Sequence, residues 1–153
     1  MRILVLSDSH GDFRRMYRVI EQHKDIDNIF FLGDGIKEFE DICDIYPQKK
    51  LCAVSGNCDF MSMCPSTNLC KTSKGLILYT HGDAYGVKLG IGKLLLAATE
   101  RGARLVLFGH THERYAEKVD DIYLFNPGSL GKSGSYGICE LSEKEITMSH
   151  YVM

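Results

Sequence analysis

The sequence predicts an α/β protein, and three features of the chain support this fold class. Short aliphatic runs alternate with amphipathic helical segments over the first two thirds of the sequence. A polar loop rich in Gly, His, Asp or Asn follows each aliphatic run. The last third changes to strand-like segments separated by turn residues. With 153 residues the chain is long enough to bury one core, so we expect a single domain over residues 1–153.

The first half of the chain is predicted to repeat a cycle of strand, polar loop and helix. The opening aliphatic run is typical of a buried strand. Apolar residues then recur at three- and four-residue spacing after Asp12, a suitable N-cap, and Pro47 follows the second helical segment. In chain order, the predicted elements are strand 2–6, helix 12–24, strand 28–32, helix 37–46, and strands 51–54 and 76–79.

The second half is predicted to contain one helix, one further buried strand and an antiparallel tail. The helix carries Leu94, Leu95 and Ala98 on its buried side and ends before Gly102, a residue suited to the left-handed C′ position. Turns are expected at Pro127-Gly128-Ser129 and at residues 142–145. The predicted elements are helix 87–101, strand 105–108, and antiparallel strands 122–126, 136–141 and 146–152.

Composition argues against several classes of protein. The formal net charge is −2 and no basic tract occurs, so we expect no dedicated nucleic-acid surface. No apolar run approaches the roughly 18 residues that cross a bilayer, and no export signal opens the chain, so a cytoplasmic protein without a membrane partner is expected. The six cysteines form no C-x-x-C pair and are interpreted as reduced thiols.

Seven metal-ligand side chains fall in the polar loops that follow predicted strands. In an open α/β sheet such loops converge on one crevice. Carboxylate and imidazole groups without thiolate argue against a closed zinc site, and seven ligands suit two ions that share a carboxylate. Side-chain alternation in extended backbone would turn the members of a pair two residues apart to the same side. The seven residues are Asp8, His10, Asp34, Asn57, His81, His110 and His112.

These motifs resemble those of the calcineurin-like metallophosphoesterases, specifically the small bacterial and archaeal phosphodiesterase branch, over essentially the whole chain. The resemblance implies an α/β/β/α sandwich of two mixed sheets flanked by helices. It also implies that Asp8, His10, Asp34 and His112 hold one metal, and that Asp34 bridges to a second metal held by Asn57, His81 and His110. The matching strings are Asp8-Ser9-His10, Gly33-Asp34, Gly56-Asn57-Cys58-Asp59, His81-Gly82 and Gly109-His110-Thr111-His112.

The activity implied by the resemblance is dimetal-dependent hydrolysis of a small phosphodiester, in which a hydroxide that bridges the two metals attacks phosphorus. Mn²⁺ is the first expectation for both ions, with Fe, Ni²⁺ and Zn²⁺ as alternatives. Asn57, Cys58 and Asp59 are the candidate catalytic residues, and Asn57 is expected to orient the phosphate.

Cys58 departs from the pattern of many larger relatives, in which a histidine at this position helps to protonate the leaving group. Cysteine is common there in the small branch. Proton donation would then fall to Cys58, Asp59, Asp83 or water, and good leaving groups would be favoured. Cys58 is alternatively a buried packing residue, which is the more common role of a free cysteine. Asp83 stands where relatives often carry a second histidine, and is expected beside the metal ligands.

Two other functions stay open at this point. The same metal site can support a phosphomonoesterase or a protein phosphatase, and a retromer subunit of the family keeps the fold as a protein-binding scaffold. The filled set of seven ligands favours an enzyme over the scaffold. Phe60, Met61, Met63 and Tyr85 are expected to form a partly apolar substrate wall or a homodimer contact.

Overall fold

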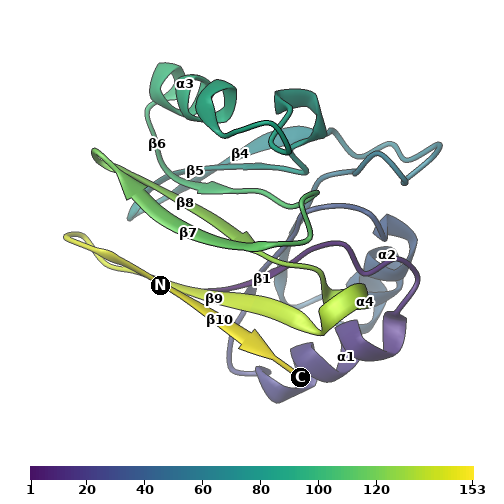
Figure 1. The fold of residues 1–153 in the computed structure, drawn as a ribbon. Coiled ribbons are helices and arrows are strands. Elements are labelled where there is room, and N and C mark those ends of the chain that lie inside the picture. The colour runs from purple at the N-terminus through teal and green to yellow at the C-terminus, as the bar shows by residue number, and fades with distance from the viewer.

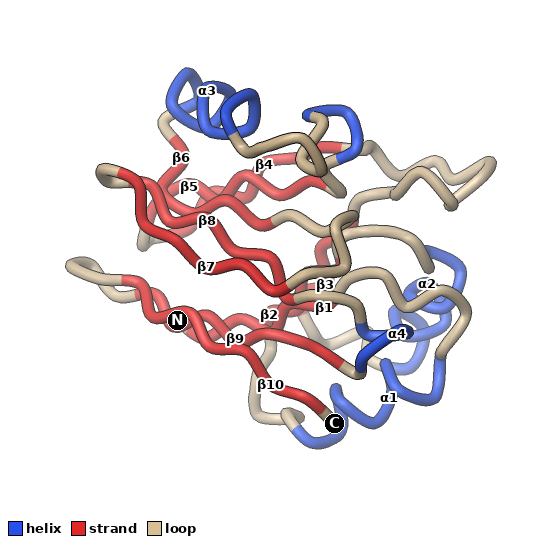
Figure 2. Tube along the Cα trace, in the orientation of Figure 1, coloured by secondary structure: helices blue, strands red, loops and turns tan.

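The computed structural model describes residues 1–153 and shows two five-stranded sheets that pack face to face, with helices on both outer surfaces (Figure 1). Both sheets are mixed, because each combines parallel and antiparallel strand pairs. The four layers confirm the expected α/β/β/α sandwich (Figure 2). None of the helices combines the length and apolar character needed to cross a membrane.

The first sheet has the strand order β10-β9-β1-β2-β3. Strands β1, β2 and β3 run parallel, β9 runs antiparallel to β1, and β10 runs antiparallel to β9. In the register, Val5 lies between Phe30 on one side and Gly137 on the other. The strands are β1 (Arg2–Leu6), β2 (Asn28–Phe31), β3 (Lys50–Ala53), β9 (Ser135–Leu141) and β10 (Ile146–Val152).

The second sheet has the order β4-β5-β6-β8-β7, in which β5, β6 and β8 run parallel. Antiparallel strands β4 and β7 form its two edges. The strands are β4 (Thr67–Thr72), β5 (Gly75–Thr80), β6 (Ala103–Leu107), β7 (Arg114–Val119) and β8 (Ile122–Pro127).

Residues of each central strand alternate between two separate cores. Ile3 and Val5 of β1 face the second sheet, whereas Leu4 and Leu6 face the helices. This double burial explains the continuous aliphatic run, because neither face of the strand meets water. Helices α1 (Phe13–Gln22), α2 (Ile36–Ile45) and α4 (Leu130–Ser133) cover the first sheet, and α3 (Gly92–Arg101) covers the second.

The helix ends agree in part with the sequence expectations. The Asp12 side chain accepts a hydrogen bond of 3.0 Å from the Arg15 backbone N–H, which confirms the N-cap. Gly102 ends α3 in the left-handed conformation, with φ of 67°. The expected start of this helix at residue 87 is wrong, because α3 begins at Gly92. The preceding Gly90 has φ of 143°, which a right-handed helix does not allow.

The expected antiparallel tail is also wrong in one respect. Strand β8 is parallel to β6 in the second sheet, whereas β9 and β10 belong to the first. The segment Pro127-Gly128-Ser129 therefore carries the chain from one sheet to the other and is no hairpin turn. Four short elements were not expected from the sequence: β4, β7, α4 and a 3₁₀ turn, η1 (Asp83–Tyr85).

Candidate metal centre

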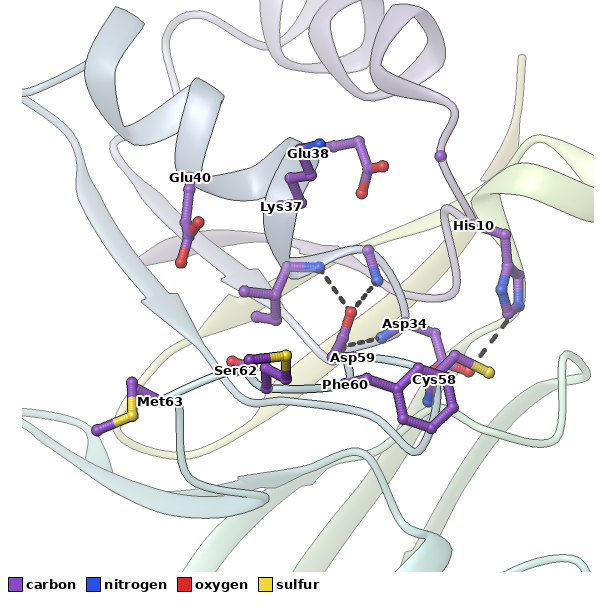
Figure 3. A pocket seen from close by; sticks show the side chains of 14 residues that line it. His10, Asp34, Lys37, Glu38, Glu40, Cys58, Asp59, Phe60, Ser62 and Met63 are labelled. Atoms are coloured by element: carbon purple, nitrogen blue, oxygen red, sulfur yellow. Dashed lines mark hydrogen bonds and ion pairs between the residues drawn. The ribbon is translucent and has the colours of Figure 1, made fainter.

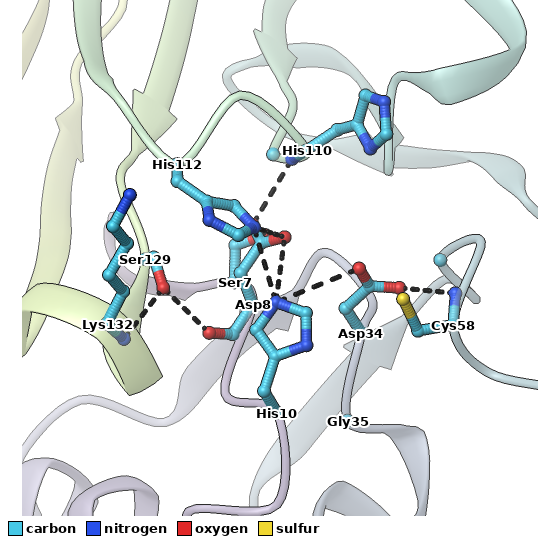
Figure 4. Close-up of polar contacts among 12 residues, drawn as sticks. Ser7, Asp8, His10, Asp34, Gly35, Cys58, His110, His112, Ser129 and Lys132 are labelled. Atoms are coloured by element: carbon cyan, nitrogen blue, oxygen red, sulfur yellow. Dashed lines mark hydrogen bonds and ion pairs between the residues drawn. The ribbon is translucent and has the colours of Figure 1, made fainter.

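The seven side chains selected from the sequence come together where the two sheets meet. They lie in loops after the carboxyl ends of five strands, and each sheet supplies part of the set. Figure 4 shows several of them pointing toward one another across the junction of the sheets. They are Asp8 and His10 after β1, Asp34 after β2, Asn57 after β3, His81 after β5, and His110 and His112 after β6.

One group of ligand atoms is formed by Asp8, His10 and His112. The Nε2 atoms of His10 and His112 are 3.2 Å apart. The same His112 nitrogen lies 3.2 Å from Asp8 Oδ1 (Figure 4). One ligand atom from each of these residues lies within 4.8 Å of the others, so the group could hold a single cation.

A second group is centred on His81, which is completely buried. Its Nδ1 donates a 2.7 Å hydrogen bond to the Leu32 carbonyl oxygen, which can only accept. The proton therefore sits on Nδ1, and Nε2 presents a lone pair. That lone pair faces Asn57 Oδ1 at 3.1 Å and His110 Nδ1 at 3.2 Å. A histidine fixed by a backbone carbonyl in this way is the usual arrangement of a metal ligand.

Asp34 lies between the two groups and touches both. Its Oδ2 is 3.9 Å from His10 Nε2 in the first group and 3.5 Å from His81 Nε2 in the second. Its other oxygen, Oδ1, accepts a 2.8 Å hydrogen bond from the Cys58 backbone N–H. The carboxylate is almost completely buried, so a charge at this position needs compensation from a nearby cation.

At this junction the hydrogen-bond acceptors outnumber the donors, as the surroundings of Asp8 show. Asp8 Oδ2 accepts hydrogen bonds from the Ser7 hydroxyl and the His110 backbone N–H, at 2.5 Å and 3.2 Å. Its partner oxygen, Oδ1, is buried and has no hydrogen-bond donor. Buried polar atoms are nearly always satisfied. An unsatisfied carboxylate oxygen beside imidazole nitrogens fits a divalent cation, and we conclude that these residues suit such an ion.

Five of the seven residues have left-handed backbone conformations that are uncommon for residues other than glycine. Their φ values are 53° at Asp8, 48° at His10, 58° at Asp34, 67° at His110 and 62° at His112. The expectation of extended backbone with alternating side chains is therefore wrong. Successive sharp bends, instead of strand pleating, turn these side chains toward the junction.

Asp59 holds two of the ligand loops together through their backbones. Its Oδ2 accepts hydrogen bonds of 2.7 Å from the N–H groups of Asp34 and Gly56. Its Oδ1 accepts from Gly35 and Ile36 at 2.8 Å and 2.9 Å, at the start of α2. All four contacts use the carboxylate as an acceptor. In this structure Asp59 positions the loop that carries Asp34, instead of pointing a proton at the ligands.

Cys58 is exposed, which overturns the expectation of a buried packing residue. Its Sγ accepts a 3.4 Å hydrogen bond from the Asn57 side-chain amide. Desolvation and, after it, the hydrogen bond and charge of Asp34 raise the pKa of the thiol above its ordinary value. The thiol therefore keeps its proton at neutral pH and has one to donate.

His110 is neutral at physiological pH, as a metal ligand must be. Desolvation lowers its pKa, and His81 and Lys88 lower it further, although Asp83 and Asp8 act in the opposite direction. Asp83 thus lies close enough to His110 to influence it, as the sequence suggested. One oxygen of Asp83 is buried without a hydrogen-bond partner.

Three supporting residues were missed in the sequence. The Ser7 and Ser129 hydroxyls donate to the Asp8 side chain and to the Asp8 carbonyl oxygen, respectively. Asn126 donates from its side chain to the Gly109 carbonyl oxygen at 2.9 Å and braces the loop of the two histidines. All three supporting residues are completely buried polar groups. Their position at the ends of apolar strands is the one signal in the sequence that indicates them.

The remaining two histidines lie away from the junction. His23 Nε2 lies 3.0 Å from the Tyr136 hydroxyl, next to the last strand. His150 Nε2 donates a 2.8 Å hydrogen bond to the Asn126 carbonyl oxygen. Both imidazoles thus have structural partners of their own.

A cavity of about 470 Å³ opens beside the ligands, between the start of α2 and the loop of residues 58–63 (Figure 3). His10, Asp34 and Cys58 form part of its wall. Phe60, Met61 and Met63 also line it, whereas Tyr85 packs on the α3 side of the second sheet. The volume is in the range of small-molecule sites in proteins.

Comparison with known sequences gives a consistent result. Residues 1–149 match the family model described as the calcineurin-like phosphoesterase superfamily domain. The probable metallophosphoesterase YsnB of Bacillus subtilis is 29% identical over 99% of this chain and 90% of its own length. The phosphodiesterase YfcE of Escherichia coli K12 is 28% identical over 92% of this chain and 88% of its own length.

Solved structures share the fold. A predicted phosphoesterase from Streptococcus pneumoniae superposes with a TM-score of 0.86 at 26% identity, over 99% of this chain and 88% of that one. Vps29 of Entamoeba histolytica, solved with Zn²⁺, gives a TM-score of 0.78 at 21% identity, over 99% of this chain and 92% of that one. At that identity the second likeness concerns the fold alone.

Proposed function

The chain belongs to the calcineurin-like phosphoesterase superfamily and is a hydrolase of phosphoric ester bonds, and from this premise we propose that it cleaves phosphodiesters with the help of two divalent ions. The observation that carries the proposal is the position of the buried Asp34 carboxylate. Its Oδ2 lies within 4 Å of His10 Nε2 in one ligand group and of His81 Nε2 in the other. A shared carboxylate of this kind is how proteins hold two metals side by side.

In this proposal Asp8, His10, Asp34 and His112 hold one ion, and Asp34, Asn57, His81 and His110 hold the other. When bound, such ions lower the pKa of water to supply a nucleophile and neutralise charge on the phosphoryl oxygens. Mn²⁺ is the proposed ion for both positions, because the donors are oxygen and imidazole nitrogen without thiolate; Fe, Ni²⁺ and Zn²⁺ share these preferences in part.

The chain's own residues then bind and orient the ester. Asn57 presents its Oδ1 to the ligand group of His81 and donates from Nδ2 to Cys58 Sγ, so its amide is placed to align a phosphoryl oxygen beside Cys58. Cys58 lies beside the ligand groups and keeps its thiol proton. A thiol is a weaker general acid than an imidazolium, so esters with good leaving groups should react fastest.

Two observations favour a diester over a monoester as the substrate: some relatives are named phosphodiesterases, and the junction already carries the negative charges of Asp8 and Asp34. A monoester dianion would bring one more negative charge beside Asp8 and Asp34, and no arginine is among the residues that line the cavity. The second arm of a diester instead has a cavity to enter. These features support the diester without identifying the natural substrate.

The test compares hydrolysis of bis-p-nitrophenyl phosphate and p-nitrophenyl phosphate by chelator-stripped protein, with and without added Mn²⁺. We expect diester turnover only with the ion, and at least a hundredfold loss, on the scale of about 10²–10³ per electrostatic group, in Asp34→Asn and His112→Ala. Asp121→Asn, in the exposed turn between β7 and β8, is the matched control and should keep full activity.

A scaffold without catalysis is the second candidate, because the Vps29 fold superposes over almost the whole chain. It predicts a folded protein that hydrolyses neither ester with any divalent ion. The same assay therefore separates the two functions, since metal-dependent turnover lost in Asp34→Asn is incompatible with a pure scaffold.

A further inference from the structure

We propose that the cavity between α2 and residues 58–63 binds one alcohol arm of the phosphodiester and selects arms that carry a positive charge. The inference rests on the proposed function, because it assigns the substrate class of the same site. It follows from where the cavity begins, from the exposed aromatic ring on one wall, and from uncompensated carboxylates on the other.

The cavity begins at the ligand junction. His10 and Asp34 form its inner end together with Cys58. An ester whose phosphoryl group lies at the ligand junction therefore has room to extend one alcohol arm into this cavity.

One wall of the cavity is apolar and open to solvent. Phe60 is 85% exposed and Met63 is 98% exposed, although a chain usually covers such side chains. Figure 3 shows the Phe60 ring directed toward the end of the cavity where Cys58 lies. An uncovered aromatic face attracts a cation, and quaternary ammonium groups are recognised in this way.

The opposite wall is acidic. The first turns of α2 place Lys37, Glu38 and Glu40 along the cavity, which gives this wall a net charge of one negative unit. Glu38 Oε2 is buried and has no hydrogen-bond partner, and the carboxylate lies against Gly35. Asp59 also lines the cavity, but four backbone N–H groups already compensate it.

An arm between these walls meets an aromatic face on one side and excess negative charge on the other. A positively charged group gains from both, whereas a carboxylate or a second phosphate on the arm is repelled by α2. The alcohol class that fits is therefore an amino or quaternary ammonium alcohol. The bulk of such a head group also suits the thioether of Met63, which adapts to irregular surfaces.

The experiment uses two phosphodiesters of the same shape that differ in one charge. Methyl phosphocholine carries a trimethylammonium group, and methyl 3,3-dimethylbutyl phosphate replaces it by a neutral tert-butyl group. Each is measured as a competitive inhibitor of bis-p-nitrophenyl phosphate hydrolysis by the Mn²⁺-loaded protein. We expect the inhibition constant of the cationic probe to be about tenfold lower, as a cation–π contact with partial desolvation allows.

Variants locate the source of this preference. The double variant Glu38→Gln/Glu40→Gln and the single variant Phe60→Ala should each reduce the ratio of the two inhibition constants to about threefold or less. Two matched controls should leave the ratio unchanged: Glu145→Gln, in the turn at the far end of the first sheet, and Leu89→Ala, an exposed side chain outside this cavity. Glu38 is half-buried and the other substituted side chains are exposed, so all variants should fold.

Equal inhibition constants in the wild-type protein would overturn the inference. So would a cationic preference that survives in both cavity variants, because it would then come from the charge of the whole protein. A Phe60→Ala variant that changes only the size of the protein in gel filtration would reassign the ring to a contact between two copies. If no ester is hydrolysed, the proposed function fails; calorimetric titration of the same two probes into Mn²⁺-loaded protein still decides the cavity's preference.

Discussion

At the scale of single residues, the backbone conformation directs the side chains of the site toward one another. Left-handed conformations at residues such as Asp8 and Asp34 cost about 1 kcal/mol or more each. Hydrogen bonds between the loops offset this cost: the Asp8 N–H donates to Gly33 O and the His10 N–H donates to Asp34 O, both at 2.9 Å. The loops therefore hold their ligands in place before any ion binds, which lowers the entropy cost of binding.

On the proposed mechanism, Cys58 limits the leaving groups that the enzyme can expel. We expect Cys58→His to raise the turnover of methyl phenyl phosphate, whose phenol leaves poorly, by about a hundredfold, as general acid catalysis allows. Methyl p-nitrophenyl phosphate should change little, because its leaving group needs no proton. The measurement is kcat for both esters with Mn²⁺ present.

The reverse substitution tests whether the thiol itself donates. Cys58→Ser should slow the phenyl ester more than the p-nitrophenyl ester, and Cys64→Ser, in the same loop, is the control. An equal loss for both esters in Cys58→Ser would show that Cys58 is no proton donor.

At the scale of elements, α2 begins where two ligand loops are fastened together. The N-cap position of α2 is Gly35, which has no side chain to cap the helix. Asp59 supplies the missing acceptor from a loop more than twenty residues away and binds the first helical N–H, that of Ile36, at 2.9 Å. One carboxylate thus caps a helix and fixes the backbone of Asp34, so the stability of α2 and the position of Asp34 depend on the same residue.

Replacement of this carboxylate should affect both properties. Asp59→Asn places an amide N–H₂ against backbone N–H donors, and we expect a loss of about 1–3 kcal/mol in the free energy of unfolding in urea. The Mn²⁺ affinity measured by calorimetry should fall about 10- to 100-fold, as for other residues that orient metal ligands. Asp121→Asn is the control. A normal affinity in a destabilised Asp59→Asn protein would limit Asp59 to a structural role.

The elements that the sequence did not reveal share a physical cause. Strands β4 and β7 are the edges of the second sheet, and edge strands carry polar residues such as Lys71, Glu117 and Lys118 that blunt pairing with other chains. They lack the aliphatic run that makes β1 recognisable. The candidate ligands, in contrast, could be selected because their chemistry stands out in the sequence, and the structure brings them together. The role of Asp59 could not, since it depends on two loops meeting in space.

At the scale of the whole molecule, the two sheets come into close contact where a glycine faces a phenylalanine. A Cβ atom added at Gly137 of β9 would lie 2.2 Å from a ring carbon of Phe125 in β8. The absence of a side chain at one position lets a large ring fill the space between the sheets. The chain crosses between these two strands next to the ligand junction, so the spacing of the sheets there also sets the spacing of the ligands.

Gly137→Ala should therefore push the sheets apart. We expect it to lower the free energy of unfolding in urea by about 1–3 kcal/mol, the usual cost of overpacking. Gly92→Ala is the matched control, because a Cβ there meets nothing within 4 Å and lies in α3. It should be neutral or stabilising by up to about 1 kcal/mol. Equal stability of the two variants would contradict the close packing.

The pH dependence of stability also belongs to the whole molecule. Burial is the main cause that lowers the pKa of His23 and of His150 below the ordinary value. The unfolded chain, with histidine pKa values of about 6.5, then binds more protons than the folded chain as the pH falls below that value. Stability should therefore decrease on acidification from pH 7.5 to 5.

Thermal unfolding of the chelator-treated protein over this pH range measures the effect. His150→Gln should flatten the dependence of Tm on pH, whatever it does to Tm at pH 7.5. A Tm that rises on acidification, or a slope that is identical in the variant, would show that these two imidazoles are not protonated on unfolding.

The candidate ligands come from both sheets, so the order of folding decides when the metal site is complete. Asp8 and His112 are separated by most of the sequence, so the full ligand set exists only after the two halves have docked. On the proposed assignment, a nascent or half-folded chain lacks the complete site, so tight binding of both ions requires the finished sandwich. An ion present at about a hundred times its dissociation constant would then stabilise that sandwich by about 2.7 kcal/mol. The cell's metal supply would thereby regulate how long the protein survives, as well as how fast it works.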